Sequence, residues 1–295
     1  MNSWYSWDEI PQALLKKPRG LVFLLGGPDT GKTTLLKRIA EAYLSTGLRI
    51  GLVDADVGQS TIGPPTTIGM VIAEVDMPDL FWPHALYFAG NNNPVGHLIE
   101  VAVGSRRMVD EAIQAGAEAV IFDSGGLIQP PYGRVLKYHK FELLRPRFIV
   151  AIERADELTP ILSWLSNCWD IEILRTRPPA EVRLVSASER TEYRQGQYRR
   201  YFSNATLKSL SLRELCLYPP DFLSGKTDLT GLLVGLQGHD WDTIAIGIIK
   251  SVGQNTVEIY ASYPSGIRIR GLLAGYIKLS WSGVELGRIR PRQFL

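Results

Sequence analysis

A glycine-rich stretch near the start of the chain has the residue types and the spacing that bind phosphate groups. Residues 26–33 read Gly-Gly-Pro-Asp-Thr-Gly-Lys-Thr and match the pattern G-x-x-x-x-G-K-[ST] in full. Glycines let the backbone close around phosphates, Lys32 can bridge the β- and γ-phosphates of a nucleotide, and the Thr33 hydroxyl can bind Mg²⁺. The nucleotide-binding set that this motif predicts is Gly26, Gly27, Pro28, Asp29, Thr30, Gly31, Lys32, Thr33 and Thr34.

Carboxylates follow two apolar segments further along the chain. Residues 53–59 read Val-Asp-Ala-Asp-Val-Gly-Gln, and Asp123 ends the apolar run 119–122, which is the Walker-B position. Parallel strands deliver their C-terminal ends to one edge of a sheet, so Asp54 and Asp56 are expected beside the phosphate loop. One carboxylate could order a Mg²⁺-bound water while another accepts a proton from an attacking hydroxyl. Asp54 could instead only cap the next segment, whereas a Mg²⁺-linked role is favoured for Asp123.

The elements that would position these residues alternate between apolar strands and helices. Strands are expected over residues 21–25, 48–53, 119–122, 147–152, 171–174 and 182–185, and helices over 33–44, 106–115 and 157–166. Continuous apolar strands alternating with helices are typical of a parallel sheet that is covered on both faces. The sequence therefore predicts a doubly wound α/β fold of the P-loop NTPase class.

The pattern of apolar and polar residues changes after about residue 202. Short alternating stretches such as Ile-Arg-Ile-Arg at 267–270 are separated by glycine turns, and a hairpin is expected within 246–260. We predict a smaller all-β C-terminal domain over 205–295, after a P-loop domain over 21–204 and a short N-terminal segment over 1–20. Core packing is the simplest role for this β domain, although Trp281, Arg268 and Arg270 leave contact with nucleic acid open.

Composition excludes several classes of protein. With 295 residues, 45% of them hydrophobic and 21% charged, the chain is neither disordered nor fibrous. No apolar run approaches the roughly 18 residues of a membrane span, so no membrane association is expected. Cys168 and Cys216 lack the spacing of a disulfide framework or a zinc site, which fits a reducing cytoplasm. A formal net charge of +2 neither requires nor excludes a polyanionic partner.

Three motifs in order carry a family resemblance. They are Gly-Gly-Pro-Asp-Thr-Gly-Lys-Thr-Thr at 26–34, Asp-Ala-Asp-Val-Gly-Gln at 54–59, and Arg194 with Arg-Arg-Tyr-Phe at 199–202. The chain resembles the polynucleotide 5′-hydroxyl kinases of the pre-mRNA cleavage complex and of ribosomal RNA processing, in their compact prokaryotic form. The acidic turn discriminates best, because generic P-loop NTPases lack it. The resemblance implies transfer of the γ-phosphate of ATP, with Mg²⁺, to the 5′-hydroxyl of single-stranded RNA or DNA.

The resemblance also implies roles for individual residues. Lys32 would act on the phosphates, Asp56 would take the proton of the 5′-hydroxyl, and Thr33, Asp54 and Asp123 would hold Mg²⁺, partly through water. Arg194 and Arg199 would belong to a mobile lid near 188–202. These two arginines lie about 140° apart on an ideal helix with Gly196 between them, so the lid is expected to be a broken helix. The alternative is a solvated, charged helix.

On the acceptor side the chain departs from the family pattern. The family usually has Thr-x-Gly-Trp or Thr-x-Gly-Phe after the Walker-B strand, whereas this chain has Ser-Gly-Gly-Leu at 124–127. Leucine offers an apolar shelf without base stacking, which is worth about 1–3 kcal/mol per base, and Tyr132 could substitute. The basic run from 134 to 147 could follow the acceptor backbone or form a solvated helix face, and His97 could contact a phosphate or fill a turn. The acceptor-binding candidates are Gln59, His97, Leu127, Tyr132, Arg134 and Lys137.

Two other classes of function remain open on the residues alone. One is a P-loop ATPase or GTPase switch that phosphorylates no acceptor, although the Asn-Lys-x-Asp loop that selects guanine is absent from the sequence. The other is a scaffold for RNA processing that binds ATP without catalysis. The intact Lys32, Thr33, Asp56, Arg194 and Arg199 argue against an inactive site.

Overall fold

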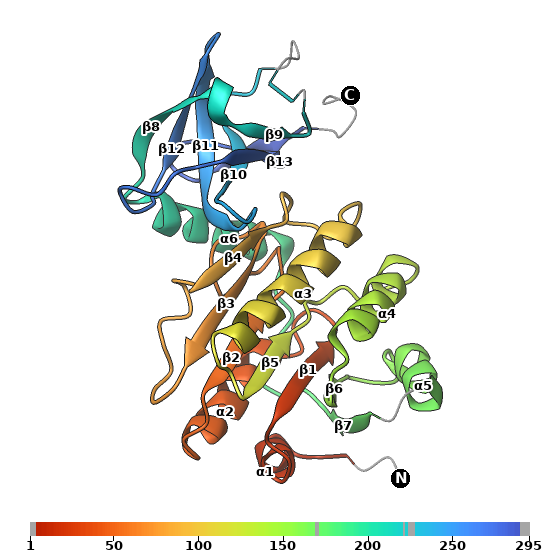
Figure 1. Ribbon diagram of the computed structural model, residues 1–295. Coiled ribbons are helices and arrows are strands. Elements are labelled where there is room, and N and C mark those ends of the chain that lie inside the picture. The colour runs from red at the N-terminus through yellow and green to blue at the C-terminus, as the bar shows by residue number, and fades with distance from the viewer. Residues whose placement is uncertain (1–3, 169–170, 221, 224–227, 290–295) are drawn as a thin grey trace.

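The computed structural model describes residues 4–168, 171–220, 222–223 and 228–289, and its strands are joined in one sheet whose C-terminal part lies above the N-terminal part in the view of Figure 1. The helices are α1 (Glu9–Leu15), α2 (Lys32–Leu44), α3 (Leu98–Gln114), α4 (Tyr132–Leu144), α5 (Thr159–Cys168), α6 (Ala187–Phe202) and the short 3-10 turn Leu212–Glu214. The strands of the first half are β1 (Gly20–Gly26), β2 (Ile50–Asp54), β3 (Thr67–Ala73), β4 (Ala85–Phe88), β5 (Ala119–Asp123), β6 (Phe148–Ile152) and β7 (Glu172–Thr176).

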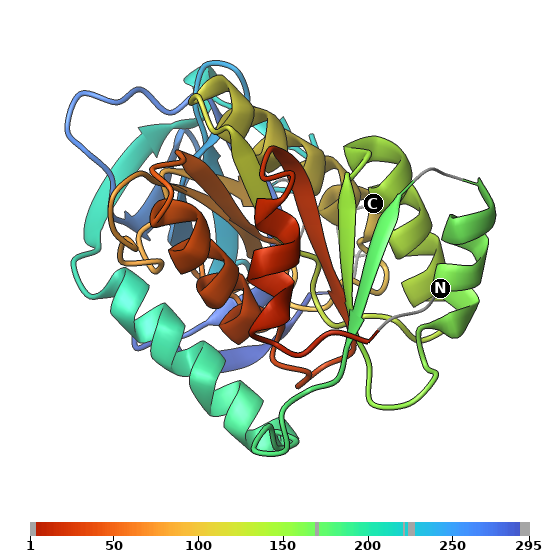
Figure 2. The same ribbon diagram turned by 90° about the horizontal axis from the view of Figure 1, so that it is seen from below.

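A parallel sheet in the order β2-β5-β1-β6-β7 forms the centre of the first half. Its residues alternate between two apolar layers, because successive side chains of a strand point to opposite faces. On β1, Phe23 packs in the layer under α3, α4 and α5, whereas Leu24 packs under α1 and α2. Figure 2 shows these two groups of helices on opposite sides of the strands. The expected doubly wound P-loop fold is confirmed.

Two antiparallel strands extend this sheet beyond β2. β3 pairs with β2, and β4 pairs with β3, both in antiparallel register. The sequence pattern predicted neither of these strands. Their residues are as apolar as those of the parallel strands, and a continuous apolar run does not reveal the direction of a strand. The sheet is therefore mixed rather than purely parallel.

The C-terminal strands are mainly antiparallel. They are β8 (Thr206–Ser211), β9 (Cys216–Tyr218), β10 (Leu232–Gln237), β11 (Thr243–Val252), β12 (Thr256–Ala261), β13 (Gly271–Leu279) and β14 (Glu285–Arg288). β11 and β12 form the expected hairpin, and the pair Thr243–Leu86 joins β11 to β4. Because this pair makes one continuous sheet, the domain division at 204/205 stays a prediction.

Helix α6 lies between the two halves (Figure 1). Its buried Tyr198, Tyr201 and Phe202 pack with Phe88 of β4 and Ile246 of β11 in one apolar cluster. Among the described residues, no helix is both long and apolar enough to cross a membrane.

Three expectations about elements were wrong. Residues 182–185 form no strand and instead run in extended loop beside the phosphate loop, where the Val185 N–H donates to Asp29 Oδ2 at 3.0 Å. Residues 267–270 form no strand either. Helix α6 continues through Gly196 without a break, because a capping box of Ser186 and Glu189 fixes its start and its aromatic residues pack on β4 and β11.

Candidate active site

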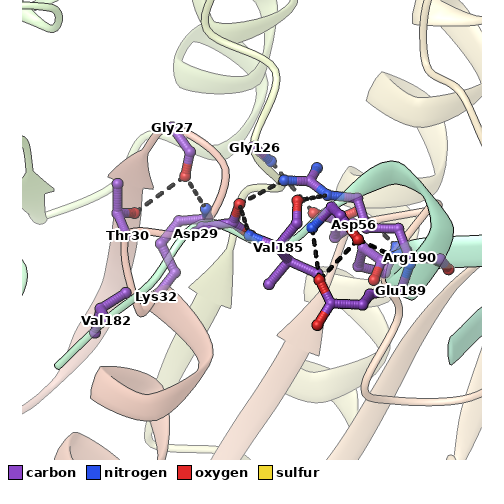
Figure 3. Close-up of polar contacts among 12 residues, drawn as sticks. Gly27, Asp29, Thr30, Lys32, Asp56, Gly126, Val182, Val185, Glu189 and Arg190 are labelled. Atoms are coloured by element: carbon purple, nitrogen blue, oxygen red, sulfur yellow. Dashed lines mark hydrogen bonds and ion pairs between the residues drawn. The ribbon is translucent and has the colours of Figure 1, made fainter.

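The phosphate loop joins β1 to α2 and has the conformation that its glycines predict. Gly31 stands at the N-cap of α2 with φ +82°, a left-handed conformation that favours glycine. The Lys32 ammonium donates to the Gly27 carbonyl at 2.8 Å, and the Thr30 hydroxyl donates to the same oxygen at 3.0 Å (Figure 3). Lys32 is 7% exposed, so its charge is held inside the loop at the start of α2, where a helix N-terminus favours anions.

Trp7 packs directly on this loop. A Cβ added at Gly31 would lie 2.7 Å from the Trp7 ring, and the indole N–H donates to the Arg177 carbonyl at 2.8 Å. The expected short N-terminal segment over 1–20 therefore contributes a side chain to the phosphate loop, which its sequence does not predict. The only available signal was the density of aromatic residues before Pro11, which does not indicate a packing partner.

Two oxygen ligands suitable for Mg²⁺ meet where α2 begins and β5 ends. The Thr33 hydroxyl donates to Asp123 Oδ2 at 3.0 Å, so a hydroxyl and a carboxylate lie together beside the phosphate loop. Mg²⁺ prefers oxygen ligands and usually uses one or two carboxylates plus substrate phosphates and water. Within the described residues no cluster of three or more acidic, His or Cys side chains could hold a metal alone. Thr33 and Asp123 therefore fit an ion that arrives with a nucleotide.

Asp54 behaves mainly as a cap. Its two oxygens accept backbone N–H groups of Asp56 at 2.9 Å and of Thr61 at 2.6 Å. Burial, together with the neighbouring Asp123 and Asp56 carboxylates, raises the pKa of Asp54 to about 8. Because both oxygens already bind the backbone, Asp54 fits a metal less well than Asp123.

Asp56 is held at the wall of a cavity by three backbone amides. Oδ1 accepts from Gly58 at 3.1 Å and from Gln59 at 2.9 Å, while Oδ2 accepts from Gly126 at 3.3 Å. The side chain is half-buried and still reaches the cavity. These amides fix the orientation of the carboxylate at the cavity wall.

The cavity of about 280 Å³ brings together several of the predicted residues. Pro28, Asp56, Gln59, Leu127 and Arg194 all line it. Asn92, Gln129 and Arg190 line it as well, and the sequence analysis did not select them as site residues. The phosphate loop, the acidic turn and α6 therefore meet at one hollow, as the motif order predicts.

Helix α6 contacts the phosphate loop through an arginine that was not among the predicted site residues. The Arg190 guanidinium binds Asp29 Oδ2 at 2.5 Å (Figure 3). Arg154 donates to the Asp29 carbonyl at 2.6 Å. Arg190 precedes Arg194 by one helical turn, so the shared helix face was a usable signal. Arg154 follows β6, and the sequence held no motif that would indicate it.

The two predicted lid arginines differ in position. Arg194 is half-buried at the cavity, where its Nε donates to Glu285 Oε1 of β14 at 2.6 Å. The Arg199 side chain is exposed and does not line the cavity. Because α6 is unbroken, Arg194 and Arg199 keep the angular separation expected for an ideal helix. This separation places the Arg199 side chain outside the cavity.

Two acceptor candidates do not face the cavity. His97 is 6% exposed at the start of α3, with its ring 4.4 Å from the Tyr276 ring and its Nδ1 3.7 Å from Glu100 Oε1. It therefore fills a turn rather than facing an acceptor phosphate. Lys137 is fully buried, and its ammonium donates to the Ser124 and Gly125 carbonyls at 2.8 Å each. The prediction that Lys137 lies on a solvent-facing backbone track is wrong, because the side chain points into the protein.

The remaining acceptor candidates lie at or near the surface. Gln59 donates to the Arg190 carbonyl at 3.2 Å and connects the acidic turn to α6. Leu127 forms part of the cavity wall. Tyr132 and Arg134 are exposed on α4, and Arg134 borders a separate hollow with Tyr138 and Trp164.

Comparison with known proteins identifies the family. A family model described as the mRNA cleavage and polyadenylation factor CLP1 P-loop matches residues 26–204. This chain belongs to the CLP1 P-loop family. The match covers the phosphate loop, the acidic turn and α6, which are the elements that meet at the cavity.

Archaeal proteins are similar to this chain in sequence. A polyribonucleotide 5′-hydroxyl-kinase of Pyrococcus horikoshii is 34% identical over 76% of this chain and 63% of its own length. One of Pyrococcus furiosus is 29% identical over 92% of this chain and 91% of its own length. The chain thus spans less than two thirds of the first relative.

A solved structure supports the same fold. The wild-type Clp1p–Pcf11p (454–563) complex contains a chain that superposes with a TM-score of 0.69 at 12% identity. The superposition covers 92% of this chain and 78% of that chain. This similarity extends the CLP1-like fold into the C-terminal strands, beyond the residues that the family model matches.

Proposed function

We propose that this chain is an ATP-dependent polynucleotide 5′-hydroxyl kinase, which transfers the γ-phosphate of ATP to the 5′-hydroxyl of an RNA or DNA end. The observation that carries the proposal is that Pro28 of the phosphate loop and Asp56 line the same cavity. A hydroxyl bound there would meet a phosphoryl donor and a proton acceptor together. The names of the archaeal relatives, which are polyribonucleotide 5′-hydroxyl-kinases, support this reaction.

The donor side would be organised by the phosphate loop. When ATP binds, the Lys32 ammonium would leave the Gly27 carbonyl and bind the β- and γ-phosphate oxygens. A hydrogen bond from the ammonium to a charged phosphate oxygen is stronger than one to a neutral carbonyl. Thr33 and Asp123 would hold Mg²⁺, with Asp54 supporting the acidic turn behind them. When bound, Mg²⁺ would neutralise charge on the transferring phosphoryl group.

The acceptor side would be organised by Asp56. The 5′-oxygen forms a bond to the γ-phosphorus while the bond from that phosphorus to the β–γ bridging oxygen breaks, and ADP leaves. The hydroxyl proton passes to the Asp56 carboxylate, which the amides of Gly58, Gln59 and Gly126 keep oriented. Leu127 would support the terminal base, and a single strand can enter because the cavity opens to the surface.

Arginines from α6 would stabilise the charge that develops during transfer. Arg194 already lines the cavity, and Arg190 lies beside it in contact with the phosphate loop. A guanidinium that reaches the transferring phosphoryl group lowers the barrier by electrostatic stabilisation. Arg199 would contribute only after α6 moves, since its side chain is exposed and outside the cavity.

The test is transfer of radiolabel from γ-labelled ATP to a 5′-hydroxyl oligonucleotide. We expect label to enter RNA or DNA of about ten nucleotides and not the same strand carrying a 5′-phosphate, and transfer should weaken steeply with added salt. Equal efficiency with a free nucleoside would instead identify a nucleoside kinase.

Two alternatives predict different results in the same assay. An ATPase switch would consume ATP at a rate that a 5′-hydroxyl strand does not change, and would label no strand. A scaffold would bind ATP with neither hydrolysis nor transfer. The cavity shared by Pro28 and Asp56 favours the kinase.

A further inference from the structure

Two lysines on the inner face of α4 lie beneath the candidate site and have no part in the mechanism above. Lys137 and Lys140 are both 0% exposed. Taking an ammonium group out of water is costly unless hydrogen bonds and opposite charges compensate. A pair of such groups one helical turn apart therefore requires a structural or functional explanation.

The Lys137 ammonium donates all of its hydrogen bonds to one short loop. It donates to the Ser124 carbonyl, the Ser124 hydroxyl and the Gly125 carbonyl, each at 2.8 Å. An ammonium has three N–H donors, so all of them bind the loop that follows β5. Lys140 donates to the same Ser124 carbonyl at 3.1 Å and lies 5.2 Å from the centre of the Phe122 ring.

The other side of this loop holds the carboxylates of the site. The Gly125 N–H donates to Asp123 Oδ1 at 3.2 Å, and the Gly126 N–H donates to Asp56 Oδ2 at 3.3 Å. A Cβ added at Gly126 would lie 3.1 Å from Pro28, so the loop also presses on the phosphate loop. The loop thus fixes the base and the metal-linked carboxylate relative to the phosphates.

The buried lysines also face the charges of the site. Asp54 and Asp56 approach from the end of β2, Asp123 approaches from the end of β5, and Lys32 approaches from the phosphate loop. Burial lowers the pKa of Lys140 to about 7, while these carboxylates oppose that shift. Burial also holds the pKa of Lys137 well below its usual range, and Lys140 and Lys32 lower it further.

We propose that Lys137 is a positioning residue for phosphoryl transfer, which holds residues 124–126 from behind so that Gly126 and Gly125 fix Asp56 and Asp123. Lys140 shares the Ser124 carbonyl and supports the same loop. The inference rests on the proposed kinase function and assigns that reaction a residue that does not touch substrate. A displacement of about 1 Å in a catalytic group can reduce turnover about 100-fold.

The experiment compares Lys137→Met and Lys140→Met with Lys16→Met, which removes an exposed lysine at the end of α1. We expect Lys137→Met to lower kcat about 10- to 100-fold at saturating substrates, with the affinity for a fluorescent ATP analogue little changed. Lys140→Met should have a smaller effect, and Lys16→Met should have none. Melting followed by circular dichroism shows whether each variant folds.

Two readouts distinguish positioning from a purely structural role. Positioning predicts that kcat falls while ATP affinity and the acceptor KM stay close to those of the unmodified protein. It also predicts a change in the backbone amide NMR signals of Gly125 and Gly126, because these amides bind Asp123 and Asp56, and this readout needs no kinase activity. A folded Lys137→Met with the kcat and the Gly126 amide signal of the unmodified protein overturns the proposal. If that variant does not fold, Lys137→Gln, which keeps a donor and loses the charge, is judged by the same criteria.

The design also separates this inference from the proposed function. An unmodified protein that transfers no phosphate to any 5′-hydroxyl strand refutes the kinase. In that case the Gly126 amide signal in Lys137→Met still decides whether the lysine holds the loop that binds the Asp56 carboxylate. An active unmodified protein with an equally active Lys137→Met refutes the positioning role alone.

Discussion

Replacing Asp56 with asparagine tests the chemical centre of the proposal most directly. Oδ1 accepts two backbone bonds, from Gly58 and Gln59, whereas Oδ2 accepts one from Gly126. The oxygen of asparagine can keep the first two bonds. Its amide would then face the Gly126 N–H, donor against donor, and its basicity would be lost. The variant therefore removes the proton acceptor while it keeps most of the local geometry.

The expected magnitudes separate chemistry from stability. Loss of a general base reduces kcat by typically about 10²–10⁴-fold, so we expect a decrease of at least about 100-fold. Loss of the single Gly126 bond would cost about 1–3 kcal/mol if that amide were left unpaired, and less where water can reach it. ATP affinity should change little, because Lys32 and the loop amides bind the phosphates.

The assay is single-turnover phosphorylation of a 5′-hydroxyl oligonucleotide across a range of Mg²⁺ concentrations. Asp123→Asn is the matched control: it removes the carboxylate that binds the Thr33 hydroxyl, so added Mg²⁺ should partly restore its rate. Asp54→Asn should act mainly through stability, since both oxygens of Asp54 bind backbone. Restoration of Asp56→Asn by Mg²⁺ would show that the base and the metal-linked carboxylate had been assigned the wrong way round.

Further variants test the surrounding residues. Lys32→Ala should abolish transfer while the melting temperature stays close to that of the unmodified protein, and substantial residual transfer would contradict the phosphate-loop assignment. Leu127→Trp should lower the acceptor KM if the terminal base stacks at this wall; an unchanged KM would show that the side chain does not face the base. Glu285→Gln should weaken the contact between residue 285 and Arg194. Steady-state kinetics should then show a larger change in kcat than in the KM for ATP. Stability should rise from about pH 7.5 to about pH 9.5, because the unfolded chain keeps a proton at Lys140 that the folded protein releases near pH 7; Lys140→Met should flatten this rise in urea unfolding.

The sequence predicted the parts of the site that depend on local geometry. The phosphate loop needs glycines at fixed positions, so its motif determines the turn, and Asp56 and Asp123 follow from the edge at which parallel strands end. Those residues do meet at one cavity or beside it. The direction of β3 and β4 could not be predicted, because buried strands of either direction have the same apolar pattern.

Side-chain partners made by the tertiary fold were the parts that sequence reasoning missed. A basic residue on an amphipathic helix is usually solvated, and the carbonyls that bind Lys137 belong to residues 12 and 13 positions earlier. His97 looked like a phosphate ligand for the same reason, since the sequence cannot show Tyr276 packing on its ring. Arg190 could have been predicted as a site residue from the helix period, because it lies one turn before Arg194 on the same helix face.

The C-terminal strands participate in the site through the helix that they support. Glu285 of β14 accepts from Arg194 at 2.6 Å and from Asn92 at 3.1 Å, and both of these partners line the cavity. Arg288 donates to the Asn92 side chain at 2.8 Å, which completes a chain of contacts from β14 to the cavity. Because the aromatic residues of α6 are also buried against β11, any movement of α6 must either carry the C-terminal strands with it or break this apolar contact. The C-terminal part therefore limits how Arg194 can approach a transferring phosphate, even though none of its residues belongs to the phosphate loop.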